Sequence, residues 1–266
     1  MKKYLNLGCS EKYVVDKSWV NIDFVASENV LGMNILKGLP YENDSVDGVF
    51  SSCMLEHFSK TQAEDHIKEC YRVLRKGGIL RVVVPDLEDV CREYLNMLDN
   101  VRNNISYESR YDYIVIELID QMTRMEPGGE MLKYWQSDTK DEEYIKERTG
   151  YPAGYNESNS GYESKKLGDR VKRTLSAWKE KMQKGTVKKC GEYALSGEQH
   201  KWMYDSFSLI RLYERTGFSG VEKMNYNESR IENWKEYALE LDEEGMEYKP
   251  HSIYIEGIKL ASGYWR

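Results

Sequence analysis

The segment from Ile79 to Val84 is apolar at every position except Arg81, and it constrains the fold more than any other feature of the sequence. An apolar run without polar alternation is typical of a β-strand that is covered on both faces of a parallel sheet. Parallel neighbours need long crossover connections, which are usually helices. The segment therefore predicts an α/β fold in which helices flank a mostly parallel sheet.

A helix is expected directly before this strand. Ser59 and Gln62 form the pattern of a capping box at its start. Apolar residues then fall on one face at helical spacing; they are Ala63, Ile67, Cys70 and Leu74. We expect the helix to end at Gly77-Gly78, and His66 to lie on its exposed side.

Strands and helices alternate through the first 98 residues. Three further strands are predicted, at Tyr4–Leu7, Trp19–Ile22 and Val46–Ser51. The polar segment Ser10–Lys17 is a candidate helix, and Asp86 is expected to cap a helix from Leu87 to about Leu98. This alternation predicts parallel strands that are joined by right-handed crossovers.

The alternation is interrupted after residue 98. A helix rich in Ile, Leu and Met is expected around Tyr113–Met125, and a loop is expected from Thr149 to Gly161. Residues 163–189 carry ten Lys or Arg and three acids, so they form either a solvated helix face or a surface that recruits an anionic substrate. The predicted domains are a core of residues 1–98 and 201–266 and an inserted helical cap of residues 99–200.

The last part of the chain returns to the α/β pattern. A helix is predicted from Ser206 to Thr216, with Phe207, Ile210, Leu212 and Tyr213 as its apolar residues. Strands are predicted at Val221–Tyr226 and Ser252–Leu260, and we expect the final strand to run antiparallel to its neighbours.

The composition narrows the functional classes. The net charge of −7 disfavours nucleic acid as a partner. The five cysteines form no CxxC pair and no zinc-ligand spacing with histidine, so we expect reduced thiols, no metal and a cytoplasmic location. No apolar stretch approaches the roughly 20 residues of a transmembrane helix, and the N-terminus has no signal-peptide core.

Two residues at strand ends predict a nucleotide-type site. Gly8 follows the first strand, where a turn lets a ligand approach the backbone, and Asp23 ends the second, where a carboxylate meets ribose hydroxyls. They are fifteen positions apart, and Cys9 and Ser10 stand where a G-x-G-x-x-G loop would continue. The pattern disfavours a pyrophosphate cofactor such as NAD and is compatible with S-adenosylmethionine (SAM).

Several motifs resemble class I SAM-dependent methyltransferases, and in particular their type 11 group. They are Leu5–Ser10, which resembles motif I with Ser10 in place of its second glycine, Val20–Asp23, Leu39–Ser52, Leu55–Phe58 and Tyr71–Gly78. The resemblance implies a Rossmann-like methyltransferase sheet, mostly parallel with one antiparallel strand near the C-terminus, and SAM as the cofactor.

By this resemblance, Asp23 would hold the ribose, Asn34 would face the adenine amino group, and Ile35 would pack on the ring. Asn34 could instead be a turn former. The cofactor-binding residues implied are Asn6, Leu7, Gly8, Cys9, Asp23, Phe24, Asn34, Ile35, Ser51 and Ser52.

Further motifs resemble a methyltransferase subgroup that is associated with polysaccharide and lipopolysaccharide biosynthesis. They are Val84–Leu87, Glu117–Met122, Gly128–Met131, His200–Tyr204 and Lys249–Gly257. They imply O-methylation of a sugar or glycan precursor, with His57 and His200 as candidate catalytic residues and Trp202 and Tyr204 as candidate substrate-binding residues. For His57 and His200, a purely structural role is the alternative, and Glu56 is equally ambiguous.

Other functions remain open at this point. A SAM-binding module without turnover is one, because Ser10 replaces a motif glycine. A nicotinamide oxidoreductase and an RNA methyltransferase are others, the latter only if the basic run follows a phosphate backbone. The expected partners are a small-molecule or glycan acceptor and, as an open alternative, a second copy of the chain.

Overall fold

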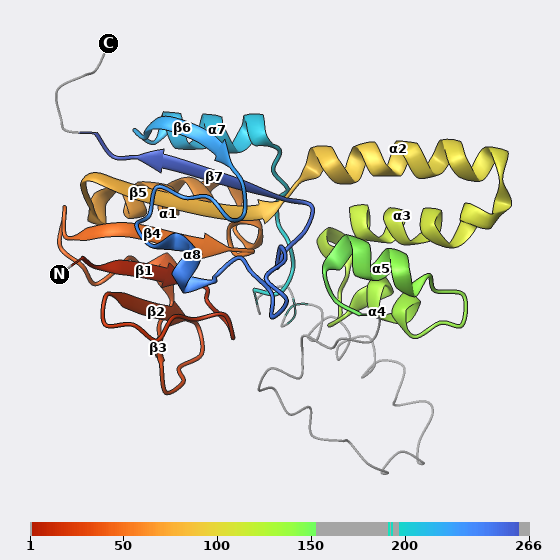
Figure 1. Ribbon diagram of the computed structural model, residues 1–266, viewed down its shortest axis with the longest axis horizontal. Helices are drawn as coiled ribbons and strands as arrows, with labels where there is room; N and C mark the ends of the chain where they lie inside the picture. The colour runs from red at the N-terminus through yellow and green to blue at the C-terminus, as the bar shows by residue number, and fades with distance from the viewer. Residues whose placement is uncertain (1, 153–190, 192, 194–196, 261–266) are drawn as a thin grey trace.

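The computed structural model describes residues 2–152, 191, 193 and 197–260. Within them lies one seven-stranded sheet with the order β3-β2-β1-β4-β5-β7-β6 (Figure 1). The strands are β1 (Tyr4–Leu7), β2 (Trp19–Asp23), β3 (Val30–Gly32), β4 (Val46–Ser52), β5 (Leu74–Pro85), β6 (Ser219–Met224) and β7 (Ser252–Ile258). The first five run parallel, and β7 is antiparallel to β5 and to β6. This confirms the predicted Rossmann-like sheet with one antiparallel strand near the C-terminus.

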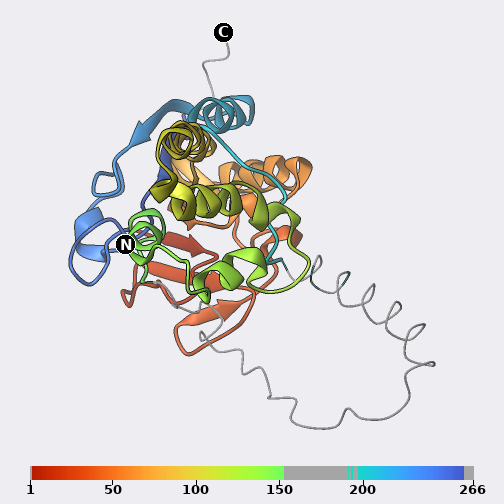
Figure 2. The same cartoon turned by 90° about the vertical axis from the view of Figure 1, so that its right-hand side faces the viewer.

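The helices divide into two groups. Helices α1 (Lys60–Val73) and α7 (Ser206–Arg215) flank the sheet. A second group lies beyond the ends toward which β1, β4 and β5 point (Figures 1 and 2); it consists of α2 (Leu87–Asn103), α3 (Glu108–Thr123), α4 (Gly129–Trp135) and α5 (Glu142–Thr149). The short elements are η1 (Ile35–Lys37), η2 (Leu55–His57), η3 (Ile105–Tyr107) and α8 (Trp234–Tyr237). None of the helices that the structure describes is long and apolar enough to cross a bilayer.

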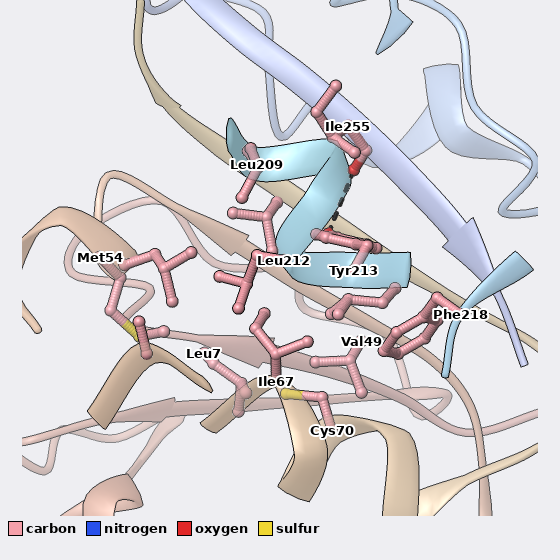
Figure 3. Packing of buried hydrophobic residues seen from close by; sticks show 14 of the residues in the cluster. Leu7, Val49, Met54, Ile67, Cys70, Leu209, Leu212, Tyr213, Phe218 and Ile255 are labelled. Atoms are coloured by element: carbon pink, nitrogen blue, oxygen red, sulfur yellow. Dashed lines mark hydrogen bonds between the residues drawn. The ribbon is translucent and has the colours of Figure 1, made fainter. Parts of the chain in front are cut away.

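The main core lies between the sheet and the helices α1 and α7. Side chains alternate between the two faces of a strand, so Leu7 of β1, Val49 of β4 and Ile255 of β7 share one face and are buried there (Figure 3). Ile67 from α1 and Leu212 from α7 pack in the same cluster. The opposite face has its own aromatic cluster, in which the Phe50 and Trp234 rings lie 5.2 Å apart.

The start of α1 is as predicted, but its end is not. Ser59 and Gln62 form the capping box. The helix ends at Val73, because Leu74 already has extended backbone angles and begins β5. Gly77-Gly78 therefore lies inside this strand, where the Gly77 N–H donates to the Lys259 carbonyl at 2.7 Å. The glycine pair lies at the register shift between β4 and β5 instead of at a helix end.

The prediction that His66 lies on the exposed side of α1 is wrong. His66 is 4% exposed, and its Nε2 lies 3.5 Å from the Cys70 sulfur. Its spacing of three residues from Ala63 and four from Cys70 puts it on the buried face. Burial lowers the pKa of the imidazole to about 4, so His66 is a neutral core residue.

The candidate helix at Ser10–Lys17 is also absent, since no helix is assigned there. Two buried side-chain amides hold this segment as a loop. Asn6 donates to the Lys12 carbonyl at 3.0 Å, and Asn21 bonds both the N–H and the carbonyl of Val14. Backbone groups that are satisfied by side chains in this way do not need a helix.

Helix α2 is longer than expected and passes through residue 98 without a break. It packs with α3, α4 and α5 around a separate core that includes Met97, Tyr113 and Tyr144. We therefore propose that the helical unit begins at Leu87, earlier than the expected boundary. The predicted loop beyond residue 152 and the basic run of residues 163–189 lie outside the described residues.

Helix α7 matches its predicted range almost residue for residue, and Asp205 caps it. Leu212 and Tyr213 are buried, as expected for its apolar face. Phe207 is 67% exposed, so its assignment to the apolar face was wrong.

Candidate active site

The ends of three parallel strands meet at one edge of the sheet. Leu7 of β1 is in register with Ile22 of β2 on one side and with Ser51 of β4 on the other. The strand order reverses between β1 and β4, and ligands of open α/β sheets bind in the crevice at such a switch point. The predicted cofactor residues at the ends of β1, β2 and β4 are therefore neighbours in space.

Gly8 has two reasons to be a glycine. Its φ of +67° is a left-handed conformation, and its N–H donates to the Ile22 carbonyl at 2.8 Å. A Cβ at this position would also lie 2.9 Å from Cγ and from Sδ of Met54. Ser10, at the place of the second motif glycine, has a φ of +44°, so the turn keeps its shape at a cost of roughly 1–2 kcal/mol.

The Asp23 carboxylate accepts hydrogen bonds and has acceptor capacity left that fits a SAM ribose. Its Oδ2 accepts the Ser10 N–H at 2.8 Å, and its Oδ1 accepts the Phe24 N–H at 2.6 Å. A carboxylate has about four lone-pair sites, so about two remain for ribose hydroxyls. The same bonds tie the turn after β1 to the end of β2, and Asp23 is half-exposed at the sheet edge.

The other predicted cofactor residues differ in how they are placed. Phe24 is 74% exposed beside Asp23, and Ile35 is half-buried against the main core. The Asn34 side chain accepts the Leu36 N–H at 3.0 Å and caps η1, which is the turn-forming role; its contact with adenine stays a prediction. Asn6 is buried and holds the loop after β1, so its side-chain amide is used structurally.

The remaining residues of the turn and of β4 are mostly buried. Leu7 is fully buried in the main core, and Cys9 is 5% exposed. Burial, together with the charge of Asp23, raises the pKa of the Cys9 thiol to about 12, so it stays neutral. Ser51 is buried and Ser52 half-buried at the end of β4.

The acceptor side of the site brings together residues that are far apart in sequence. Glu56 and His57 belong to η2, directly after β4, and His200 follows the helical unit. The rings of His57 and His200 meet edge to face, with centroids 4.7 Å apart. One ligand-type atom from each of the three residues lies within 4.8 Å of the other two.

Backbone hydrogen bonds fix this arrangement. The N–H groups of Lys201 and Trp202 donate to the Glu56 carbonyl at 2.8 and 3.2 Å. The His200 N–H donates to the Gln121 carbonyl, at the end of α3, at 3.0 Å. Residues 200–202, which we call the strap, therefore connect η2 of the core to the helical unit.

Burial shifts the pKa values of the titratable side chains in this group. Glu56 is 1% exposed, and burial raises the pKa of its carboxyl to about 8, although the positive charge of Lys249 acts in the other direction. His200 is buried too, and burial, followed by the charges of His57 and Arg124, lowers its pKa well below the ordinary value. His200 is thus a neutral imidazole at physiological pH.

The two predicted substrate residues lie beside this group. The Tyr204 ring is 4% exposed, and burial and the charge of Glu56 raise the pKa of its hydroxyl to about 12. Trp202 is half-buried, and the Lys60 ammonium lies 3.6 Å from the centroid of its ring. Contact of either residue with an acceptor stays a prediction.

Sequence reasoning missed Glu240, which is 2% exposed in the loop after α8. Burial raises the pKa of its carboxyl to about 7, while Arg81 and the Ser52 hydroxyl act in the other direction. Glu240 therefore lies close to the end of β4. It comes from the acidic segment Glu228–Glu247, in which no local pattern separates the buried acid from the exposed ones.

Comparisons with known proteins agree with this geometry at the level of a domain. Residues 4–82 match the family described as "Methyltransferase domain". No curated protein matches the chain.

Solved structures that are similar include a complex of the Haloferax volcanii Trm112 methyltransferase activator with a methyltransferase. It has 10% identity, a TM-score of 0.40, and coverage of 98% of this chain and 83% of that one. A SAM-dependent methyltransferase from Thermotoga maritima has 13% identity, a TM-score of 0.39, and coverage of 97% and 83%. One from Archaeoglobus fulgidus has 12% identity, a TM-score of 0.40, and coverage of 97% and 86%.

These three likenesses are too weak to transfer a substrate or a partner, so the assignment depends on the matched domain together with the strand order and the sheet edge. Residues 4–82 form a methyltransferase domain.

Proposed function

We propose that the protein transfers the methyl group of SAM to a hydroxyl oxygen of a sugar or glycan precursor. The observation that carries this proposal is the group Glu56, His57 and His200. Glu56 and His57 follow β4, whose end is in register with the end of β1, where Gly8 begins the turn. The subgroup motifs of the sequence support the choice of acceptor, and His200 and Tyr204 belong to one of these motifs.

Bound SAM supplies a methyl group that is already activated on a sulfonium, so the protein has to position the acceptor and exclude water. Asp23 would hold the ribose hydroxyls, and the backbone around Gly8 and Ser51 would line the methionine end. The helices α2–α5 lie beyond the same strand ends and would cover the acceptor. His57 and His200 are the residues that we expect to meet the acceptor hydroxyl.

The cofactor residues are tested by titrating SAM into the full chain and measuring heat. We expect binding to wild type and a loss of at least about tenfold in affinity for Asp23→Ala, because the ribose loses its carboxylate acceptor. Asp16→Ala is the matched control, since Asp16 is an exposed acid in the loop before β2, and its side chain bonds only to Ser18 among the described residues. Equal affinity of the two variants would contradict the role of Asp23.

The acceptor class is tested by a screen of nucleotide sugars and glycan fragments with radiolabelled SAM. We expect label in a sugar, as an ether that survives mild base. Labelled RNA is the competing outcome, and it would depend steeply on salt, because phosphate contacts release counterions. Transfer to RNA, or to none of the sugars while extract proteins are labelled, would contradict the sugar assignment.

The four described cysteines, Cys9, Cys53, Cys70 and Cys91, are free thiols. This supports the proposal of a reducing, cytoplasmic location. Cys190 lies outside the described residues.

A further inference from the structure

The Glu56 carboxylate is in an unusual position for an acid. It is 1% exposed, and neither of its side-chain oxygens has a hydrogen-bond partner among the residues that the structure describes. Buried carboxylates are normally paired, hydrogen-bonded or bound to a metal, because an isolated one is costly. The described residues therefore leave this buried carboxyl without a hydrogen bond, although the charge of Lys249 acts on it, at the place where the acceptor substrate is expected.

Two imidazole side chains lie near the Glu56 carboxyl. Ligand-type atoms of Glu56, His57 and His200 lie within 4.8 Å of one another. A metal ion with bonds of about 2.0–2.2 Å holds its ligand atoms roughly 3–4 Å apart, so a small side-chain adjustment closes the group around an ion. No other such group of His, Cys, Asp and Glu occurs in the described part of the chain.

We propose that Glu56, His57 and His200 form a binding site for one divalent transition-metal ion. Two imidazoles and one carboxylate on one side of an ion favour Zn²⁺, Fe²⁺, Co²⁺ or Mn²⁺ over Mg²⁺ and Ca²⁺, which prefer oxygen ligands. Three protein ligands leave the other coordination positions open for a substrate oxygen or water.

The backbone holds the three ligands in place without an ion. The strap donates two N–H groups to the Glu56 carbonyl, and the His200 N–H is fixed on the end of α3. The ligands thus come from two elements that are already bonded to each other, and this lowers the cost of assembling the site.

The role of the ion rests on the proposed function, but its binding does not. Beside the methionine end of SAM, an ion in this site would bind the acceptor hydroxyl and orient its oxygen toward the methyl group. His57 and His200 would then act as ligands, and the acceptor hydroxyl, made more acidic by the ion, would release its proton to solvent water as the methyl group is transferred. Binding of the ion is a property of this chain that is measurable without any acceptor.

The experiment uses the full chain after treatment with a chelator. Zn²⁺ is added in equilibrium dialysis, and Co²⁺ is added in a separate titration in which its visible absorption reports the ligands. We expect about one equivalent of either ion, with an affinity that falls at least about a hundredfold in Glu56→Gln and in His200→Gln. His57→Gln should show the same fall in metal affinity. With three ligand variants, misfolding of one of them does not decide the result, and circular dichroism checks that each variant is folded.

Two matched controls should keep full metal binding. Glu240→Gln changes another buried acid near the end of β4, and His66→Gln changes a buried histidine of the main core. No binding by wild type at about 0.1 mM ion, or unchanged binding in Glu56→Gln and His200→Gln, would overturn the proposal. SAM is titrated into the same metal-free protein, so loss of the cofactor site and loss of the metal site give separate results.

Discussion

Gly8 combines a left-handed backbone with a close approach to Met54, so its replacement tests the turn after β1 at the scale of a single residue. We expect Gly8→Ala to lower the free energy of unfolding by about 1–2 kcal/mol from the backbone alone, and by more if Met54 cannot move. SAM affinity should fall together with stability, because the same turn positions the Ser10 N–H that Asp23 accepts.

Gly245→Ala is the matched control for this change. Gly245 has a φ of +78° with no atom within 4 Å of the added Cβ, so it carries the backbone strain without the contact. Urea unfolding and SAM calorimetry on both variants separate the two causes. If Gly245→Ala weakened SAM binding as much as Gly8→Ala, the local role of the turn would be refuted.

His66 gives a prediction for pH. Its pKa is about 4 in the folded protein and about 6.5 when unfolded, so between these values only the unfolded chain takes up the proton. The stability contributed by neutral His66 is therefore complete above about pH 6.5 and is lost as the pH falls toward 4. From about pH 7.5 to about pH 5 the loss should be about 2 kcal/mol.

The measurement is urea unfolding of wild type and His66→Leu at both pH values. The drop in unfolding free energy between them should be about 2 kcal/mol smaller in the variant, because leucine does not titrate. An identical drop in the two proteins would show that His66 is not the group responsible.

The positions of candidate site residues in the fold were predictable where the signal is local. Gly8 and Asp23 stand at the ends of two strands that the sequence predicts. These strands, β1 and β2, are neighbours that a short connection joins. The proximity of Glu56 to His200 was not predictable, since it depends on how the chain comes back from the helical unit to η2. The burial of His66 could have been predicted, because its spacing to Ala63 and Cys70 puts it on the apolar face of the helix.

At the scale of elements, Arg148 of α5 links three helices of the helical unit through ion pairs. Its guanidinium donates to Glu117 of α3 at 2.7 and 3.0 Å and to Asp89 of α2 at 2.8 Å, and it is 5% exposed. Removing one partner of a buried ion pair leaves the others uncompensated. We expect Arg148→Met to cost about 3 kcal/mol or more, and to speed amide exchange in α5 before it does so in the sheet.

Arg92→Met on α2 is the matched control. Arg92 pairs with Glu88 on the same helix, and both side chains are largely exposed, so the change should stay within about 0.5 kcal/mol. Comparable losses from the two variants, by chemical unfolding, would mean that Arg148 does not join the helices.

Element types followed well from the sequence, and boundaries followed less well. The apolar run in β5, the capping box of α1 and the cap of α7 are local signals, and each is found in the structure. The end of α1 was misplaced because a glycine pair is equally suited to a helix end and to a bend in a strand. Helix α2 runs past residue 98 and ends at Asn103, and its buried residues Val90 and Met97 pack in the core of the helical unit, a tertiary contact that no local pattern shows.

At the scale of the whole molecule, the two proposed ligands, SAM and a metal ion, would bind different parts of the fold. SAM would contact the turn after β1 and the end of β2, both within the sheet. An ion at Glu56, His57 and His200 would hold η2 of the core against the strap, which is bonded to α3. One ligand would therefore stabilise the sheet edge, and the other would stabilise the junction between the sheet and the helical unit.

Hydrogen exchange of the full chain should separate these effects, because ligand binding slows the amides that its site orders. SAM should slow the amides of Gly8 and Ser10, whose N–H groups bond to Ile22 and Asp23. Zn²⁺ should slow those of His200 and Lys201. Asp23→Ala should abolish only the first effect and Glu56→Gln only the second. If Zn²⁺ slowed exchange in the turn after β1 and not in the strap, the ion would be bound elsewhere, and the junction between sheet and helices would have another basis.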